Sequence, residues 1–353
     1  MKEDAFIGCL LGTAVGDSLG LPYEGLSPQR AAKLFPDTTK HHFFFGKGMV
    51  SDDTEHACFV TQAIIRSKGD VEEFQNQLAR SLRWWLLGLP AGIGFATLRS
   101  IIKLWFGIPP TKSGVFSAGN GPAMRSPILG VAFGYDAELL KQYVKASTEI
   151  THRDPKAFYA AFAVALASLD IVCADTQWQE DFQTSLKRLL PDEGAREFHE
   201  LVERAKISAE NNEPVTKFAE SIGSKKGISG YSYHTVPCVF QVWFKYGDDF
   251  ETGLQEIIKA GGDTDTAGAI YGGIVGARVG KDAIRKSWIN NIIEWPRTVS
   301  WMERLGSAVA DAVGEPPSNV TCPRYFIPGI LLRNLCFLLV VLAHEFRRLV
   351  QSY

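Results

Sequence analysis

The amino-acid sequence predicts an all-α fold. Apolar residues recur at three- and four-residue spacing through most of the chain, and few segments alternate between apolar and polar residues at strand length. Clusters of Asp, Ser and Thr stand just ahead of several apolar segments, where helices are expected to begin. We therefore expect a body of helices whose polar clusters lie at helix starts and in loops.

Length and composition limit the classes of protein that fit. The chain has 353 residues, of which 46% are hydrophobic and 22% charged, values typical of soluble globular proteins. Its formal net charge is -2 and no block of Lys or Arg stands out, which argues against a nucleic-acid-binding patch. The cysteines show no CxxC or Cys/His pairing, so we expect reduced, buried thiols, a cytoplasmic protein and no zinc site. They are Cys9, Cys58, Cys173, Cys238, Cys322 and Cys336.

The first predicted helix covers residues 5–19. Its apolar pattern resembles a signal peptide, but acidic residues follow Lys2 at once and Asp17 interrupts before a credible cleavage site. Glycines at positions 8, 12 and 16 would let another helix approach closely, and a second row at 268, 272 and 276 has the same property. Asp17 argues against a membrane interpretation of this spacing.

Two acidic clusters are each followed by a predicted helix. In the first, Ser51 precedes the adjacent carboxylates Asp52 and Asp53, and in the second Asp263 and Asp265 follow a Gly-Gly pair. Asp or Ser before a helix is often a simple N-cap, which is the competing interpretation of both clusters. Capping needs only one side chain, however, and adjacent carboxylates repel each other unless a cation offsets them. Oxygen ligands at this density suit Mg²⁺, Mn²⁺ or Ca²⁺ rather than Zn²⁺.

Further helices are predicted along the chain, at residues 71–87, 92–106, 137–148, 157–174, 283–293 and 299–313. The segment 157–174 is almost wholly apolar, and its alanine content favours a buried central helix over a bilayer span. The glycine-rich turn 117–125 has backbone amides that can hold a phosphate, although it is not a P-loop. An apolar helix follows the loop 228–237.

The tail has a different character. Residues 326–343 are strongly apolar, yet Arg333 and Asn334 lie among them and charged residues follow. The uninterrupted run 335–343 is too short to span a bilayer, so no transmembrane segment is expected. We predict a domain at 1–314 and an extension at 315–353 that forms a helix docked on the body or on a second subunit. An interfacial membrane helix is the alternative, and the oligomeric state stays open.

Several motifs together resemble the ADP-ribosylglycohydrolase family, which includes dinitrogenase-reductase-activating glycohydrolase, ADP-ribosylarginine and ADP-ribosylserine hydrolases, and the J1 crystallins. The resemblance covers roughly residues 4–313, and the motifs occur in the family's order. They are Gly12-Thr13-Ala14-Val15-Gly16-Asp17, Ser51-Asp52-Asp53-Thr54, Gly119-Asn120-Gly121, Thr151-His152 and Gly262-Asp263-Thr264-Asp265-Thr266. The two acidic clusters in this order are the more specific part of the match.

The resemblance implies a compact, orthogonal multi-helix globule with a centre of two Mg²⁺ or Mn²⁺ ions. Carried over position by position, the metal ligands would be Ser51, Asp52, Asp53, Asp263, Asp265 and Thr266. Many family members have Thr at the position of Ser51, and the hydroxyl survives this change. The diphosphate would lie against Gly119, Asn120 and Gly121, with His152 and Tyr233 lining the ribose and adenine pocket. Glu24 resembles the family's mobile glutamate.

The implied activity is metal-dependent cleavage of the glycosidic bond between ADP-ribose and an acceptor, which removes a mono-ADP-ribosyl group from a protein or other partner. Asp53, Glu24 and Asp263 are the residues expected to take part in the chemical step. Two other functions fit the same residues. The same carboxylates would serve a di-metal phosphoester hydrolase, and the protein could be a non-catalytic, ADP-ribose-binding or structural relative. The acceptor linkage would depend on loops such as 43–49 and 88–94.

Overall fold

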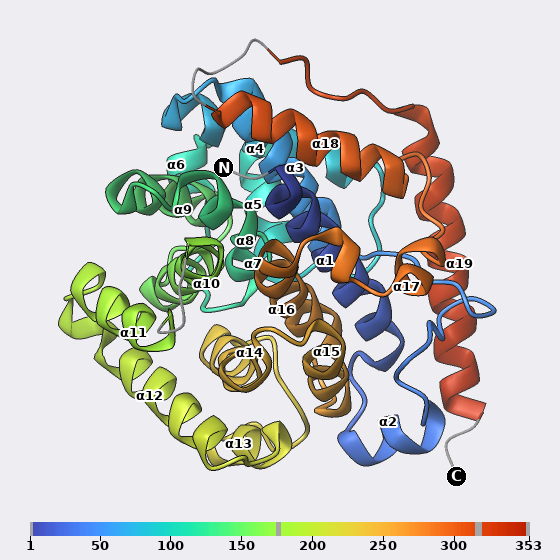
Figure 1. The fold of residues 1–353 in the computed structure, drawn as a ribbon. Coiled ribbons are helices and arrows are strands. Elements are labelled where there is room, and N and C mark those ends of the chain that lie inside the picture. The colour runs from blue at the N-terminus through green and yellow to red at the C-terminus, as the bar shows by residue number, and fades with distance from the viewer. Residues whose placement is uncertain (1–2, 174–177, 315–319, 351–353) are drawn as a thin grey trace.

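The prediction of an all-α fold is confirmed. A computed structural model describes residues 3–173, 178–314 and 320–350, with side chains 170–181 not described. Within these ranges the backbone forms helices and isolated bridges but no β-strand (Figure 1). Ala174, where the predicted helix 157–174 ends, lies outside the described residues, as do 315–319 and 351–353 of the predicted extension.

The helices follow one another with short connections. The first ten are α1 (Glu3–Gly20), α2 (Pro28–Leu34), α3 (Asp52–Ser67), α4 (Val71–Leu87), α5 (Phe95–Trp105), α6 (Pro110–Ser113), α7 (Gly121–Met124), α8 (Pro127–Phe133), α9 (Ala137–Glu149) and α10 (Pro155–Cys173). The others are α11 (Trp178–Leu189), α12 (Arg196–Glu210), α13 (Val215–Ser221), α14 (Ser232–Tyr246), α15 (Phe250–Lys259), α16 (Thr264–Val279), α17 (Lys286–Asn290), α18 (Val299–Val313) and α19 (Pro328–Val350). Short 3-10 turns cover Leu21–Tyr23, Glu193–Ala195 and Lys281–Ala283.

Two predicted boundaries are wrong. The helix expected over 283–293 is reduced to α17, because the chain turns at Lys281–Ala283 and leaves the helix at Asn291. The loop expected over 228–237 ends at Tyr231, so that α14 begins before Pro237 and contains it. Pro237 is the sixth residue of α14, so it lies beyond the first turn and removes one backbone hydrogen-bond donor from the helix.

An antiparallel pair of helices, α1 and α16, forms the centre of the molecule (Figure 1). The two predicted glycine rows face each other: a Cβ on Gly12 would lie 2.1 Å from the Gly272 carbonyl oxygen, and one on Gly16 would lie 1.9 Å from that of Gly268. Any side chain at these positions would therefore push the helices apart. This direct backbone contact brings the C-terminal end of α1 to the N-terminus of α16.

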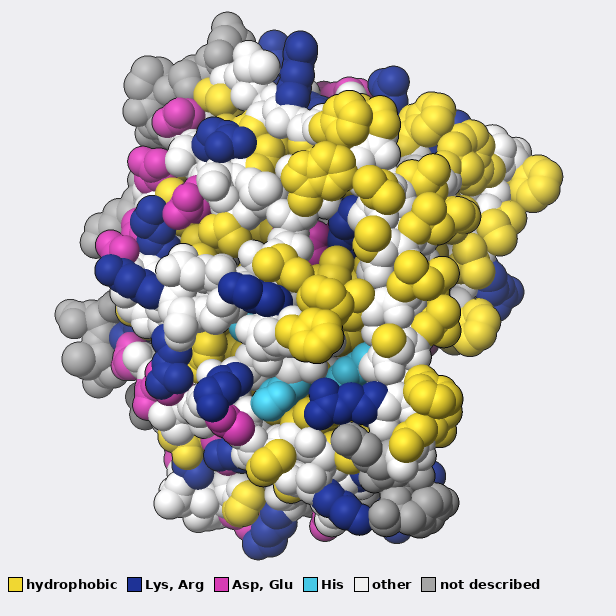
Figure 2. Space-filling view, turned by 90° about the vertical axis from the view of Figure 1, so that its right-hand side faces the viewer, with side chains coloured by type: hydrophobic (Ala, Val, Ile, Leu, Met, Phe, Trp, Pro, Cys, Tyr) yellow, Lys and Arg dark blue, Asp and Glu magenta, His cyan; other side chains and the backbone are white. Residues whose placement is uncertain are grey.

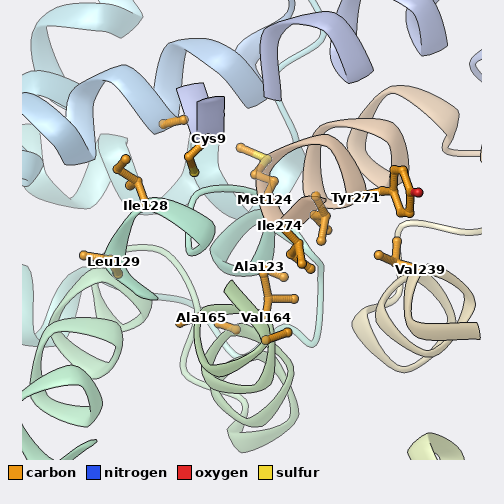
Figure 3. Close-up of a cluster of buried hydrophobic side chains, with 14 of the residues drawn as sticks. Cys9, Ala123, Met124, Ile128, Leu129, Val164, Ala165, Val239, Tyr271 and Ile274 are labelled. Atoms are coloured by element: carbon orange, nitrogen blue, oxygen red, sulfur yellow. The ribbon is translucent and has the colours of Figure 1, made fainter. Parts of the chain in front are cut away.

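The core surrounds this pair. Cys9 of α1 and Ile274 of α16 belong to a buried cluster that also includes Val164 and Ala165 of α10 (Figure 3). The helix α10 is buried along its described side chains from Ala160 to Ala167, as predicted for a central helix. Apolar contacts on every side fix the positions of the helix ends around the site.

The long helix α19 lies along one edge of the molecule (Figure 1). Arg333 forms a buried ion pair with Glu294 and donates to the Val50 carbonyl oxygen, while Asn334 donates to that of Gly88. By length and composition, α1 and α19 are both apolar enough to cross a membrane, but α1 is buried in the core whereas most of α19 is exposed. One predicted buried thiol, that of Cys336, is exposed on α19.

Candidate active site

Three helix ends meet at one side of the α1–α16 pair. The carboxylate of Asp17, near the end of α1, accepts hydrogen bonds from the backbone N–H groups of Ser51 (2.9 Å) and Thr54 (3.1 Å) at the start of α3. Asp17 thus satisfies N–H groups of a helix to which it does not belong. This contact fixes the first turn of α3, and its two carboxylates, next to the start of α16.

The two acidic clusters meet at one oxygen of Asp53. The Ser51 hydroxyl donates to Oδ2 of Asp53 (3.0 Å), and the Thr266 hydroxyl lies 3.3 Å from the same oxygen. Ser51 also accepts from the Asp53 backbone N–H (3.3 Å), so it caps α3 as the competing interpretation proposed. The other oxygen of Asp53, Oδ1, is buried and has no hydrogen-bond partner.

Asp263 occupies the N-cap position of α16 but its side chain makes no capping hydrogen bond. Its Oδ2 instead accepts from the Asn120 side-chain amide at 2.6 Å, and this amide also contacts the Thr235 hydroxyl at 3.0 Å. The capping interpretation of Asp263 is therefore wrong. The carboxylate is oriented by a residue of the glycine-rich turn, which lies far away in the sequence.

Backbone conformation and close packing explain why two glycines precede Asp263. Gly261 and Gly262 both have positive φ, 66° and 81°, and a Cβ on Gly262 would lie 1.9 Å from the Ile228 carbonyl oxygen. The Gly262 backbone pairs with Gly25 and Leu26, each at 2.7 Å. These bonds attach the Glu24 loop and the loop before α14 to the start of α16.

Burial and mutual repulsion perturb the titration of the whole acidic set. Burial, reinforced by Asp17 and other carboxylates, raises the pKa of Asp52 and Asp53 well above the usual range. Burial and the nearby Glu24 do the same to the pKa of Asp265. The pKa of Asp17 rises to about 6 because it is buried, and desolvation of the Glu24 carboxylate, with Asp263 nearby, raises its pKa to about 7.

The described residues contain no preformed cluster of three or more His, Cys, Asp or Glu side chains arranged to hold a metal ion, so the predicted di-metal centre is not shown. The donors nevertheless fit a hard divalent cation, because they are carboxylate and hydroxyl oxygens. Oδ1 of Asp53 and Oδ1 of Asp265 are both buried and unpartnered. A cation is the ligand that would satisfy these oxygens and offset the repulsion.

A cavity of about 400 Å³ opens on this acidic set. Ser51, Asp52, Asp263, Asp265 and Thr266 lie along its wall, together with Glu24. The described residues that line it include no Lys or Arg. Any anionic ligand in the cavity must therefore be held by backbone N–H groups, neutral side chains or added cations.

The glycine-rich turn and His152 form another wall of the cavity. A Cβ on Gly119 would lie 2.9 Å from Nε2 of His152, and one on Gly121 would lie 3.2 Å from its ring, so the glycines make room for the imidazole. Nδ1 of His152 lies 2.9 Å from the Thr151 hydroxyl. Burial, together with the cation of Arg125, lowers the pKa of His152 to about 3, which leaves the ring neutral.

Tyr233 is not among the residues that line this cavity. It lies in the first turn of α14, its ring 5.0 Å from that of Phe198 and its face toward the Lys156 ammonium at 4.8 Å. The early start of α14 directs this side chain into the body of the molecule. The structure therefore separates Tyr233 from the other predicted substrate-binding residues, whereas it brings Gly119, Asn120, Gly121 and His152 together.

Several lining residues were missed in the sequence. Phe337, Val341, His344 and Glu345 of α19 face the cavity, so the tail forms part of its wall. The signal was the set of polar residues within an apolar segment, at 333, 334, 344 and 348, all of which are buried. Phe43 and residues Ala91, Gly92 and Gly94 also reach the cavity, from the two loops expected to contact the acceptor.

The fold and site define an all-α protein with one acidic cavity at the meeting point of α1, α3 and α16. The profile of the ADP-ribosylglycohydrolase family matches residues 1–319, and the chain belongs to this family. The match ends before α19, so the helix that completes the cavity wall lies outside it.

Individual relatives agree with this assignment. An uncharacterized protein of Archaeoglobus fulgidus is 31% identical over 297 residues, covering 82% of this chain and 92% of its own length. ADP-ribosyl-[dinitrogen reductase] glycohydrolase of Rhodospirillum rubrum is 26% identical, with 82% and 90% covered, and ADP-ribosylhydrolase ARH3 of Gallus gallus is 25% identical, with 80% and 87% covered. A solved ADP-ribosylglycohydrolase-related protein complex is similar with a TM-score of 0.62 and 25% identity, covering 87% of this chain and 97% of that chain.

Proposed function

We propose that this protein is a hydrolase that cleaves the glycosidic bond between ADP-ribose and an acceptor, with two Mg²⁺ or Mn²⁺ ions as cofactors. One observation carries the proposal: the acidic starts of α3 and α16 converge on one cavity, and the buried Oδ1 of Asp265, which lines it, and Oδ1 of Asp53, the neighbour of the lining residue Asp52, both lack partners. Family membership supports the class of reaction. The acceptor linkage and the metal identity are the finer parts of the proposal.

Ser51, Asp52 and Asp53 would hold one cation, and Asp263, Asp265 and Thr266 the other. When bound, such cations supply positive charge for the sugar and phosphate oxygens and lower the pKa of water. The cavity needs this charge because the part of its lining that the structure describes has several carboxylates and no Lys or Arg. Without it, the diphosphate of ADP-ribose would be repelled.

The remaining lining groups can contact the rest of the substrate. In the turn at Gly119–Gly121, the backbone N–H of Gly119 donates to the Ser117 hydroxyl (3.3 Å) and that of Asn120 to the Gly230 carbonyl oxygen (3.1 Å), which leaves the N–H of Gly121 for a phosphate. His152 stays neutral and its Nδ1 contacts the Thr151 hydroxyl, so Nε2 is the ring nitrogen that can exchange a hydrogen bond with a ribose hydroxyl. Asn120, by holding Asp263, couples the substrate turn to the acidic set.

Hydrolysis requires a proton acceptor on the water side and charge stabilisation at the anomeric carbon. The water oxygen forms a bond to that carbon, the bond to the acceptor breaks, and the acceptor atom leaves with a proton. Carboxylates close to the sugar stabilise the positive charge that develops on it. Glu24 is solvent-exposed, yet desolvation of its carboxylate at the cavity and the nearby Asp263 raise its pKa to about 7, so it is suited to accept the water proton near neutral pH, and Asp53 is the other candidate.

The test is release of ADP-ribose from a panel of mono-ADP-ribosylated arginine, serine and nucleotide substrates, with Mg²⁺ and with Mn²⁺. We expect Asp263→Ala to abolish release, and an Asp263→Ala protein with full metal-dependent activity would refute the proposal. Release of inorganic phosphate instead of free ADP-ribose would identify a phosphoester hydrolase. Calorimetric binding of ADP-ribose without turnover would identify a non-catalytic binding protein.

A further inference from the structure

Several polar residues of α19 face the body of the molecule, and many of its apolar residues face outward. This is the reverse of the usual arrangement in a helix on a protein surface. Arg333, Asn334, His344 and Arg348 are buried against the body. The exposed face consists of Leu331, Leu335, Leu338, Leu339, Leu342 and Phe346, which we call the apolar face. Leu339 and Phe346 are each 67% exposed. A helix that contacts water on its outer side normally shows the reverse pattern, so this side fits an apolar environment.

Aromatic side chains extend the apolar face at both ends of α19 (Figure 2). Near its start, the Trp295 and Phe326 rings pack at 5.9 Å and both are exposed. Beside its second half, the 43–45 loop presents Phe44 and Phe45, and Phe45 is 94% exposed. Aromatic rings at the edges of an apolar surface are typical of segments that lie at a membrane–water interface.

The clefts on either side of α19 carry positive charge. One, of about 790 Å³, lies at the N-terminal end of α19 and includes Arg66 and Arg80 among apolar residues. The other, of about 590 Å³, lies beside its C-terminal half and includes Lys40, which pairs with Asp37, and Arg347. Neither cleft has Asp or Glu in its described lining. Glu345, the acidic residue of α19, is paired with Arg348.

We propose that the apolar face of α19 and its flanking aromatic residues bind the surface of an anionic phospholipid bilayer, with α19 lying in the plane of the interface. Leu and Phe side chains would enter the acyl-chain boundary, while the cations of both clefts meet lipid phosphates. This inference is independent of the proposed reaction, because none of these residues belongs to the acidic set.

A second copy of the chain is a poorer occupant of this face. In a two-fold dimer with antiparallel α19 helices, the N-terminal cleft of one copy would meet the C-terminal cleft of the other. Arg66 and Arg80 would then face Lys40 and Arg347, which places like charges together. A bilayer-spanning α19 is also disfavoured, because crossing would break the buried ion pair of Arg333 with Glu294 and the other bonds of the polar face.

This placement has a consequence for the cavity. Phe337, Val341, His344 and Glu345 line it from the inner side of α19, whereas the outer side meets lipid. The cavity would thus lie about one helix diameter, ~10 Å, from the bilayer surface. An acceptor attached to that surface would have a short path to the site.

Co-sedimentation of the full-length protein with vesicles tests the proposal. We expect binding to vesicles that contain phosphatidylglycerol, weaker binding to phosphatidylcholine alone, and weakening by salt. Leu339→Glu is expected to weaken binding roughly tenfold or more, since it removes an apolar contact and adds a like charge. Arg80→Gln is expected to weaken binding to the anionic vesicles roughly fivefold. Ile207→Glu, at an exposed apolar position on α12, is the matched control and should bind as the unmodified protein does.

An environment-sensitive dye on the exposed thiol of Cys336 provides a second readout, because its emission should shift to the blue more strongly on anionic vesicles than on phosphatidylcholine vesicles. Three results would overturn the proposal. The first is no binding, or equal binding to both vesicle types. The second is a dimer in light scattering that Leu339→Glu dissociates, with no vesicle binding. The third is vesicle-bound protein that resists extraction at alkaline pH, which indicates a spanning helix.

Discussion

Asp17 of α1 accepts hydrogen bonds from the backbone N–H and the hydroxyl of Thr54 at the start of α3. A helix start is thus capped by a residue 37 positions earlier in the chain. Because the next residues toward the N-terminus of α3 are Asp52 and Asp53, the same contact sets where these carboxylates lie relative to α16.

Removing the Asp17 carboxylate should therefore destabilise the protein and misplace the acidic set. We expect Asp17→Ala to lower the free energy of unfolding by about 2 kcal/mol, since buried N–H groups of Ser51 and Thr54 lose their acceptor. Urea denaturation in the presence of a chelator measures this without a contribution from metal binding. Asp17→Asn keeps one accepting oxygen and should recover part of the loss, and an Asp17→Ala protein of unchanged stability would contradict the assignment.

Because the backbones of α1 and α16 are in direct contact, we expect one methyl group added at a contact glycine to lower the stability of the protein strongly. Gly272→Ala places a Cβ about 2.1 Å from the Gly12 carbonyl oxygen, so the helices must separate. We expect a loss of roughly 3 kcal/mol or more, seen as a lower melting temperature. Gly94→Ala is the control, because no atom lies within 4 Å of its added Cβ and its φ is negative. Equal melting temperatures for the two variants would show that the pair is not packed as described.

Arg348 links α19 to the Glu24 loop by donating to the Glu24 carbonyl oxygen at 2.7 Å. Arg348→Ala should loosen this loop and lower kcat/KM while changing stability little. Hydrogen exchange of residues 21–26 is the independent readout and should accelerate. The neighbouring Arg347→Ala serves as the control, because the Arg347 guanidinium lies over the Phe35 ring, 5.7 Å from its centroid. Unchanged exchange in Arg348→Ala would rule out this positioning role.

The acidic set should make the metal-free protein less stable as pH rises. The pKa of Asp265 is raised by burial and by Glu24, so between pH 4 and the raised value the folded state holds a proton that the unfolded state has lost. Stability therefore falls as pH increases through that window. Asp265→Asn should raise the melting temperature of the metal-free protein at pH 8 and reduce the further rise caused by Mg²⁺ or Mn²⁺. A variant less stable than the unmodified protein in chelator would oppose this explanation.

His152 predicts the opposite pH dependence. Its folded-state pKa of about 3, depressed by burial and Arg125, lies below the ordinary value near 6.5. In this interval the unfolded state binds a proton that the folded state does not, so acidification destabilises the fold by about 1.4 kcal/mol per pH unit. Comparison with His152→Gln between pH 7.5 and 5 isolates this contribution. Parallel pH profiles for the two proteins would show that His152 is not buried as a neutral ring.

Helix positions followed well from local pattern, because apolar spacing and N-cap residues are encoded within a few residues of each other. The predicted helices 71–87 and 299–313 match α4 and α18 in their bounds. The glycine rows predicted close helix contacts but did not say that α1 and α16 are each other's partner. The spacing of glycines in the sequence indicates that a helix can be approached closely, but it does not identify the helix that approaches.

The site was harder to predict where its residues act over long sequence distances. The two acidic clusters carry a local signal, whereas the capping of α3 by Asp17 and the Asn120–Asp263 bond exist only in the folded chain. The pocket position of Tyr233 was carried over from the family resemblance, and in the structure Tyr233 lies in the first turn of α14 and is not among the described residues that line the cavity. The α19 residues were missed because hydropathy gives no indication of which face of an apolar helix meets the body.

The pairing of α1 with α16 also determines when the protein can fold. The two helices lie some 260 residues apart, so a nascent chain must be almost complete before α1 meets its partner. Until then Phe6, Leu10 and Leu11, which are buried in the finished protein, have no α16 to cover them. A ribosome-bound fragment that lacks α16 therefore exposes an apolar N-terminal segment and only half of the acidic site, which is the kind of surface that promotes aggregation.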